Sequence, residues 1–119
     1  MKTKRELKEM FDKSYQLNSD YLGDVHIIDI NNSVNMVLNA LLYFEDLDIL
    51  SIGVSEDRCI YTVSTFENLT INLDVFFDKD NHNSSGYLLN IIRDKKVICS
   101  HSFDNIAWVM LKIIEYMLT

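Results

Sequence analysis

The sequence predicts an α+β fold in which a mainly antiparallel sheet of four to six strands has about three helices, the N-terminal, the second and the C-terminal, packed on one face. Two patterns predict this fold. Apolar residues recur with the 3.6-residue period of a helix near both ends of the chain, and they alternate with polar residues in between. The chain has 119 residues, of which 48% are hydrophobic, and this is enough for one core. We therefore expect a single domain over residues 1–119.

The first element is an amphipathic helix over about residues 2–17. Its apolar face has the i, i+3, i+4, i+7, i+8 spacing of one side of a helix, and is formed by Leu7, Met10, Phe11, Ser14 and Tyr15. Charged residues fill the remaining positions, so one side of this helix should pack on the core.

The pattern breaks at Gly23, and the short β-branched segment Val25–Ile30 predicts a strand. Residues 31–33 are Asn, Asn and Ser, whose side chains accept hydrogen bonds from the free N–H groups of a first helical turn. A second helix over 34–46 should follow. It is apolar around most of its circumference, so we expect it to be buried on most sides.

Strands dominate the middle of the chain. The alternation is cleanest in Leu69–Val75, which predicts a strand with one face on the core and one in water. The other predicted strands are 47–54, 58–66, 87–93 and 96–101. The breaks between them are short and polar, as in hairpin turns, so we expect an antiparallel meander.

A final helix is predicted over 104–118, with Ser102 or Asp104 as its cap and an apolar arc of more than half its circumference. Trp108 falls in the middle of the polar side. Either another part of the chain covers this ring, or the ring is exposed and serves as an apolar anchor for a partner.

The motifs of familiar catalytic and metal sites are missing. Residues 78–83 resemble the first half of a calcium-binding EF-hand loop, but the sixth position is Asn83, where glycine is needed, and the twelfth is Leu89, where glutamate should stand. A solvated hairpin loop is the better interpretation. Glycine-rich phosphate loops, nucleophile elbows and H-E-x-x-H motifs do not occur.

The cysteines give only a weak signal. Cys99 and His101 alternate on a predicted strand, and with Cys59 or His82 nearby they could hold zinc or form a thiolate–imidazole pair. Paired ligands of the C-x-x-C type are absent, so we expect buried thiols. We predict no metal, no cofactor and no catalytic residue, and hence a protein that is not an enzyme.

The sequence also predicts a compartment. Charged residues interrupt the N-terminal segment where a signal peptide needs an apolar stretch, and no run approaches the length of a membrane span. We therefore expect a cytoplasmic protein that does not contact a membrane.

Charge is the most distinctive feature. The chain has 18 acidic and 11 basic residues, a net charge of −7, which argues against direct binding of nucleic acid. Residues 18–78 alone carry eleven acidic residues against one base, Arg58. Such a surface either keeps the protein soluble or complements a basic partner. The predicted partner-binding residues are Trp108 and the acids Glu45, Asp46, Asp48, Glu56, Asp57 and Asp74.

The leading functional hypothesis is a small acidic inhibitor of the immunity, antitoxin or anti-defence type. It would occlude a basic surface of a partner, and its carboxylates could mimic the phosphates of nucleic acid if that partner is a nuclease or another nucleic-acid-binding protein. A second hypothesis is a homo-oligomeric small-ligand-binding or regulatory domain, with a homodimer joined through one of the two apolar helices. A third is an enzyme that uses Cys99, His101 or a carboxylate pair.

Overall fold

The computed structural model describes residues 1–56, 58–78 and 84–119, and it confirms the α+β fold. Its elements in chain order are α1 (Lys4–Asn18), a 3₁₀ turn η1 (Ser19–Tyr21), α2 (Ile27–Leu42), β1 (Asp48–Ser55), β2 (Cys59–Phe66), β3 (Leu69–Phe77), β4 (Ser84–Arg93), β5 (Lys96–Phe103) and α3 (Ile106–Met117). The five strands form one antiparallel sheet in the order β1-β2-β3-β4-β5. The predicted meander is thus confirmed, and each strand lies within three residues of its predicted bounds.

Helix α1 confirms the predicted N-terminal helix, and a reciprocal cap fixes its start. The Thr3 hydroxyl accepts a hydrogen bond from the backbone N–H of Glu6, and the Glu6 carboxylate accepts one from the backbone N–H of Thr3, both at 3.1 Å. The hydrogen bond from the Thr3 backbone N–H, followed by hydrogen bonding from the Thr3 side chain, holds the pKa of the Glu6 carboxyl below its ordinary value. Leu7 and Phe11 are the buried residues of this helix.

Helix α2 corrects two predictions. It begins at Ile27 after His26, so the predicted strand Val25–Ile30 is wrong, and residues 31–33 lie inside the helix and do not cap it. The reason is a buried stripe at helical spacing that starts at Ile30 and continues through Val34 and Leu38. Burial of this stripe outweighs the β propensity of the first turn. Met36 remains 44% exposed, so the helix is less enclosed than we predicted.

Helix α3 is shorter than the predicted helix 104–118, and it begins after a different cap. Asn105 precedes the helix, and its side-chain oxygen accepts a hydrogen bond from the Ala107 N–H at 2.7 Å. The predicted caps, Ser102 and Asp104, lie before this residue.

The strand register defines the two faces of the sheet. One row of paired residues crosses it through Ile52, Thr62, Leu73, Leu89 and His101, and the first four are buried. The adjacent row, whose side chains point to the other face because of the pleat, contains Gly53, Tyr61, Asp74, Leu88 and Ser102.

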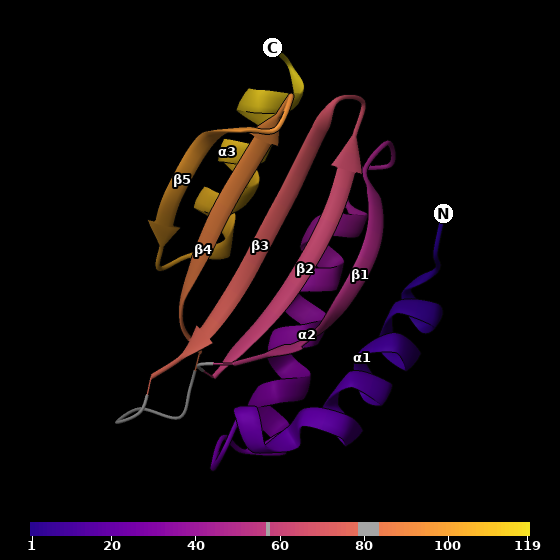
Figure 1. Cartoon of the computed structure of the whole chain (residues 1–119), viewed down its shortest axis with the longest axis vertical. Coiled ribbons are helices and arrows are strands. Elements are labelled where there is room, and N and C mark those ends of the chain that lie inside the picture. Colours follow the sequence, from indigo (N-terminus) through magenta and orange to yellow (C-terminus); the bar gives the residue numbers. More distant parts are fainter. Residues whose placement is uncertain (57, 79–83) are drawn as a thin grey trace.

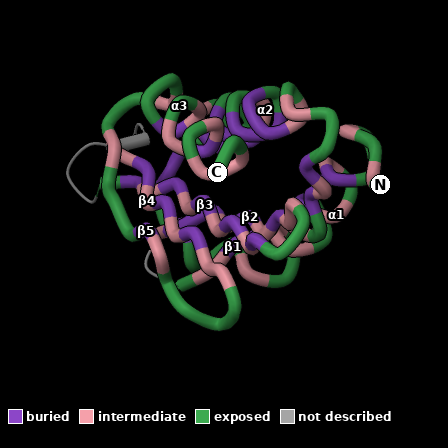
Figure 2. Tube along the Cα trace, turned by 90° about the horizontal axis from the view of Figure 1, so that it is seen from above, coloured by how far each residue is buried: buried purple, intermediate pink, exposed green. Residues whose placement is uncertain are grey.

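The helices form a second layer on the buried face. Figure 1 looks onto the sheet with α2 and α3 behind it, and Figure 2 shows the same two helices above the strands. Helix α1 lies along the outer edge of β1 and covers this edge of the sheet, whereas β5 forms the opposite edge. In the described part of the chain, no helix covers the other face of β2 to β5. None of the described helices is long and apolar enough to cross a membrane.

Candidate functional site

The uncovered side of β2 to β5 is the main candidate site, and we call it the open face. Its centre is the triplet Tyr61, Asp74 and Leu88, which are adjacent across three strands. The side chains around this triplet are half-buried against one another, and they alternate between apolar and neutral polar types. They are Val63, Thr65, Thr70, Asn72, Phe76, Asn90 and Ile92.

Asp74 is the charged group at the centre of this face. Partial burial raises its pKa, because the neighbouring side chains remove water from the carboxylate. Within the described residues its carboxylate forms no ion pair or hydrogen bond. The register places no lysine or arginine on the described open face. Asp74 is therefore a partly desolvated anion with no described cation beside it.

The other predicted acids do not gather into one cluster around Asp74. Asp48 has the open-face orientation at the start of β1, and Glu45 and Asp46 are exposed in the turn just before it. Glu56 is exposed beyond the opposite end of the same strand, about 25 Å away for a strand of this length. Asp57 lies outside the described residues. Of these acids, the strand register thus places only Asp48 on the same side of the sheet as Asp74.

Trp108 lies in the first turn of α3 and is 59% exposed, so the chain does not cover it. Leu111 and Leu118 share its side of the helix by spacing and are 55% and 82% exposed. These three residues form what we call the α3 stripe. Because α3 lies on the helix side of the sheet, Trp108 and Asp74 belong to different surfaces of the molecule.

The cysteine and histidine candidates are not brought together. Cys99 is buried, whereas His101 is exposed and packs edge-on against Phe103 with ring centroids 4.6 Å apart. Cys59 is a buried free thiol on β2, and two strands, β3 and β4, separate it from β5. Among the described residues, no group of three His, Cys, Asp or Glu side chains could hold a metal. Residues 79–83, which include His82 and most of the segment that resembles an EF-hand loop, lie outside the described residues.

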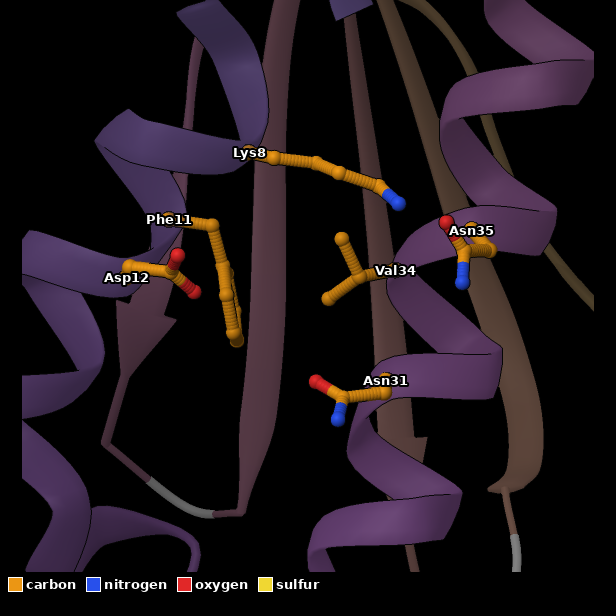
Figure 3. Close-up of a pocket in the computed structure, with 6 residues that line it drawn as sticks. All are labelled: Lys8, Phe11, Asp12, Asn31, Val34 and Asn35. Atoms are coloured by element: carbon orange, nitrogen blue, oxygen red, sulfur yellow. The ribbon is translucent and has the colours of Figure 1, made fainter. Parts of the chain in front are cut away.

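A pocket that the sequence analysis missed lies between α1 and α2 (Figure 3). Its volume is about 370 Å³. Helix α1 contributes Lys8, Phe11 and Asp12 to the lining, and helix α2 contributes Asn31, Val34 and Asn35. The signal in the sequence was the i, i+4 spacing of Lys8 and Asp12 and of Asn31 and Asn35. The predicted strand Val25–Ile30 hides this signal, because it places Asn31 before the second helix and not inside it.

Comparisons of the chain with models of protein families, with curated proteins and with solved structures find no significant match.

Proposed function

We propose that this protein is a non-catalytic inhibitor of the cytoplasm that lays its open face on a basic surface of a partner protein. The observation that carries the proposal is Asp74, a partly desolvated carboxylate without a described cation, set among apolar side chains on an uncovered sheet. A lysine or arginine of a partner would complete this arrangement, because a charge pair is stronger where water is excluded.

The surroundings of Asp74 suit a protein partner. Tyr61, Phe76 and Leu88 offer apolar and aromatic area, which supplies most of the binding energy at the centre of protein interfaces. Four strands of this length present roughly 400 Å², about half of what one partner contributes to an interface of standard size. The exposed acids Glu45 and Asp46 would extend the contact at its rim and raise the association rate.

The charge of the open face argues against a second copy as its occupant. A two-fold axis near Asp74 would bring the two Asp74 carboxylates together, and like charges in a desolvated interface are unfavourable. A partner with a basic surface, such as a nuclease or another nucleic-acid-binding protein, has the complementary charge.

The proposal is tested by capturing partners from a lysate of the native host with tagged protein, after nuclease treatment, and by measuring the affinity of the captured protein. Asp74→Asn should weaken that affinity about tenfold and reduce its dependence on salt. Glu115→Gln is the matched control, because it makes the same charge change on α3, on the far side of the sheet. An equal loss in both variants, or none in Asp74→Asn, would contradict the proposal.

A second candidate function is the homo-oligomeric domain, and the α3 stripe is the observation that favours it. Trp108, Leu111 and Leu118 expose apolar area on one side of a helix, as dimer-forming helices do before association. Light scattering distinguishes the candidates: a dimer that becomes a monomer in Leu111→Ser would support self-association through α3. A wild-type monomer would exclude it.

A further inference from the structure

The outer edge of β5 is uncovered in the described part of the chain. β5 pairs with β4 and with no other described strand, and Figure 1 shows no described helix along its other side. The outward N–H and C=O groups of such an edge can pair with a further strand unless charge, proline or a cover prevents it. Residues 97–103 contain no proline, lysine, arginine or acid, and Val97 is 60% exposed. The register with β4 is regular from Cys99 to Phe103, so this edge is able to accept another strand.

Helix α3 places an exposed tryptophan beside this edge. The helix lies over both β4 and β5, with α2 on its other side. The Tyr116 hydroxyl donates a hydrogen bond of 3.2 Å to the backbone oxygen of Ile98 in β5, so the side of α3 that carries Tyr116 faces β5. Lys112 and Trp108 precede Tyr116 at successive i, i+4 steps and follow the same side of the helix. The Trp108 ring, which is 59% exposed, therefore lies next to the free edge.

The dimensions of this edge suit a second copy of the chain. Two β5 strands that pair about a two-fold axis perpendicular to the sheet would be about 4.8 Å apart, with both helix layers on the same side. Because α3 lies over β4 and β5, the two α3 helices would then be about 10 Å apart, which is the spacing of packed helices. This contact would cover the Trp108 ring of each copy.

The charges favour antiparallel pairing of the two strands. Residues 93–96, at the start of β5, comprise three basic residues and one acid, whereas Asp104 directly follows its end. Lys96 and Asp104 are exposed, and neither forms an ion pair within the described residues. Antiparallel pairing brings the basic start of one strand near the acidic end of the other, whereas parallel pairing would bring like charges together. On α3, Lys112 and Glu115 form an ion pair at 3.1 Å and add no net charge to the contact.

We propose that two copies of this protein form a symmetric dimer in which the β5 strands pair antiparallel and the α3 helices pack side by side. The contacting wall of each copy is one strand long and two layers high, about 27 Å by 20 Å, or roughly 500 Å². Two such walls bury about 1,000 Å², the lower limit for a specific interface, so we expect a dimer that dissociates on dilution. This contact leaves the open face uncovered and does not depend on an inhibitor function.

The test is sedimentation equilibrium of the intact chain at concentrations from about 1 µM to 1 mM. The wild type should change from the mass of one chain to the mass of two. The emission of Trp108, the only tryptophan, should shift to shorter wavelength over the same concentrations, because the ring loses contact with water. A monomer at every concentration would overturn the proposal, and so would a dimer in which the tryptophan emission does not change.

Charge variants test how the strands are arranged. Lys96→Glu and Asp104→Lys should each weaken the dimer about tenfold, and the double variant should restore it to within about threefold, because opposite charges face each other again. Lys13→Glu makes the first of these changes at an exposed site on α1 and is the matched control, with an expected effect of less than about twofold. Wild-type affinity in both single variants, or no recovery in the double variant, would overturn the antiparallel β5 contact.

Two further variants separate this contact from the functions proposed above. Leu111 precedes Tyr116 by five residues and points away from β5, so Leu111→Ser should remain dimeric. A dimer that is lost in Leu111→Ser and kept in Lys96→Glu would assign self-association to the α3 stripe and overturn the β5 contact. Asp74 lies on the open face, so Asp74→Asn should dimerise like the wild type, and a failure of partner binding does not decide this proposal.

Discussion

The hydroxyl of Ser14 in α1 accepts a hydrogen bond from the backbone N–H of Val54 in β1, at 2.9 Å. β1 is an edge strand, because among the described strands it pairs with β2 alone. The outward N–H groups of an edge strand invite pairing with another chain unless something covers them. A serine of a helix satisfies one of them here, so α1 both closes the core and protects this edge.

We expect Ser14→Ala to lower the free energy of unfolding by about 1 kcal/mol, since a partly buried N–H loses its acceptor. Hydrogen exchange at the Val54 amide should accelerate more than at other amides of β1. Gln16→Ala, an exposed change on the same helix, is the control and should leave both quantities nearly unchanged. Unaltered exchange at Val54 in Ser14→Ala would show that the bond does not protect this edge.

Gly53 permits the close approach of α1. Its replacement should lower the free energy of unfolding more than Ser14→Ala does. A Cβ atom at this position would lie 2.6 Å from Ser14 Oγ and 2.7 Å from the Tyr61 hydroxyl oxygen. We expect Gly53→Ala to destabilise the protein by about 1–3 kcal/mol in denaturant unfolding, because the helix or the tyrosine must shift. In the double variant with Ser14→Ala, part of the clash is removed, so the combined loss should be smaller than the sum of the single losses. A strictly additive double variant would contradict this explanation.

Most of the fold could be predicted because local pattern and tertiary burial agree. In β3, the residues from Leu69 to Phe77 alternate strictly between buried and half-buried, and over Leu69–Val75 the sequence alternates between apolar and polar at the same positions. The exception is Val25–Ile30, where β-branched residues favour a strand but the packing of Ile30 in line with Val34 favours a helix. Such a conflict is decided by contacts distant in sequence, which a window of a few residues does not contain.

The candidate sites were less predictable, for a similar reason. Asp74 was a candidate only as one acid among several, and its position between Tyr61 and Leu88 follows from the register of three strands. The pocket at Lys8 and Asn35 depends on the antiparallel approach of α1 and α2. The exposure of Trp108 was one of two predicted alternatives, and only the packing of α3 distinguishes them.

Arg58 ties the loop between α1 and α2 to the end of the sheet. Its guanidinium donates to the Asp24 carboxylate at 2.9 Å and to the backbone oxygens of Phe77 and Asp78 at 3.2 and 3.3 Å. We expect Arg58→Lys to lower the free energy of unfolding by about 1–3 kcal/mol, because one ammonium group cannot reach three acceptors in this planar arrangement. The Arg58 side chain is 18% exposed, whereas that of Arg5 is 90% exposed in its pair with Glu9. Arg5→Lys is therefore the matched control, and equal effects of the two substitutions would contradict the assigned role of Arg58.

Asp74 should make the stability of the protein depend on pH in the direction opposite to that of a salt-bridged acid. Burial raises the pKa of Asp74 in the folded chain above its ordinary value of 3.8. At a pH between 3.8 and this raised pKa, the folded chain therefore binds more protons than the unfolded chain. The contribution of Asp74 to the free energy of unfolding therefore falls as pH rises through this window, and the penalty is complete above the folded pKa. The amide in Asp74→Asn carries no charge, so this variant does not have the penalty of desolvating a carboxylate.

We accordingly expect Asp74→Asn to be more stable than the wild type at pH 7, with the difference shrinking as pH falls toward 3.8 and Asp74 becomes protonated. Thermal unfolding of both proteins across this range measures the effect. Asp20→Asn controls for the general loss of one negative charge, because the Asp20 carboxylate is exposed and forms no ion pair or hydrogen bond with the described residues. A more stable variant that binds the partner less well would show that Asp74 is retained at a cost to the fold, as expected of a residue kept for binding. If Asp74→Asn is instead less stable than the wild type at pH 7, the carboxylate is a structural group, and its place at the centre of a binding face loses its main support.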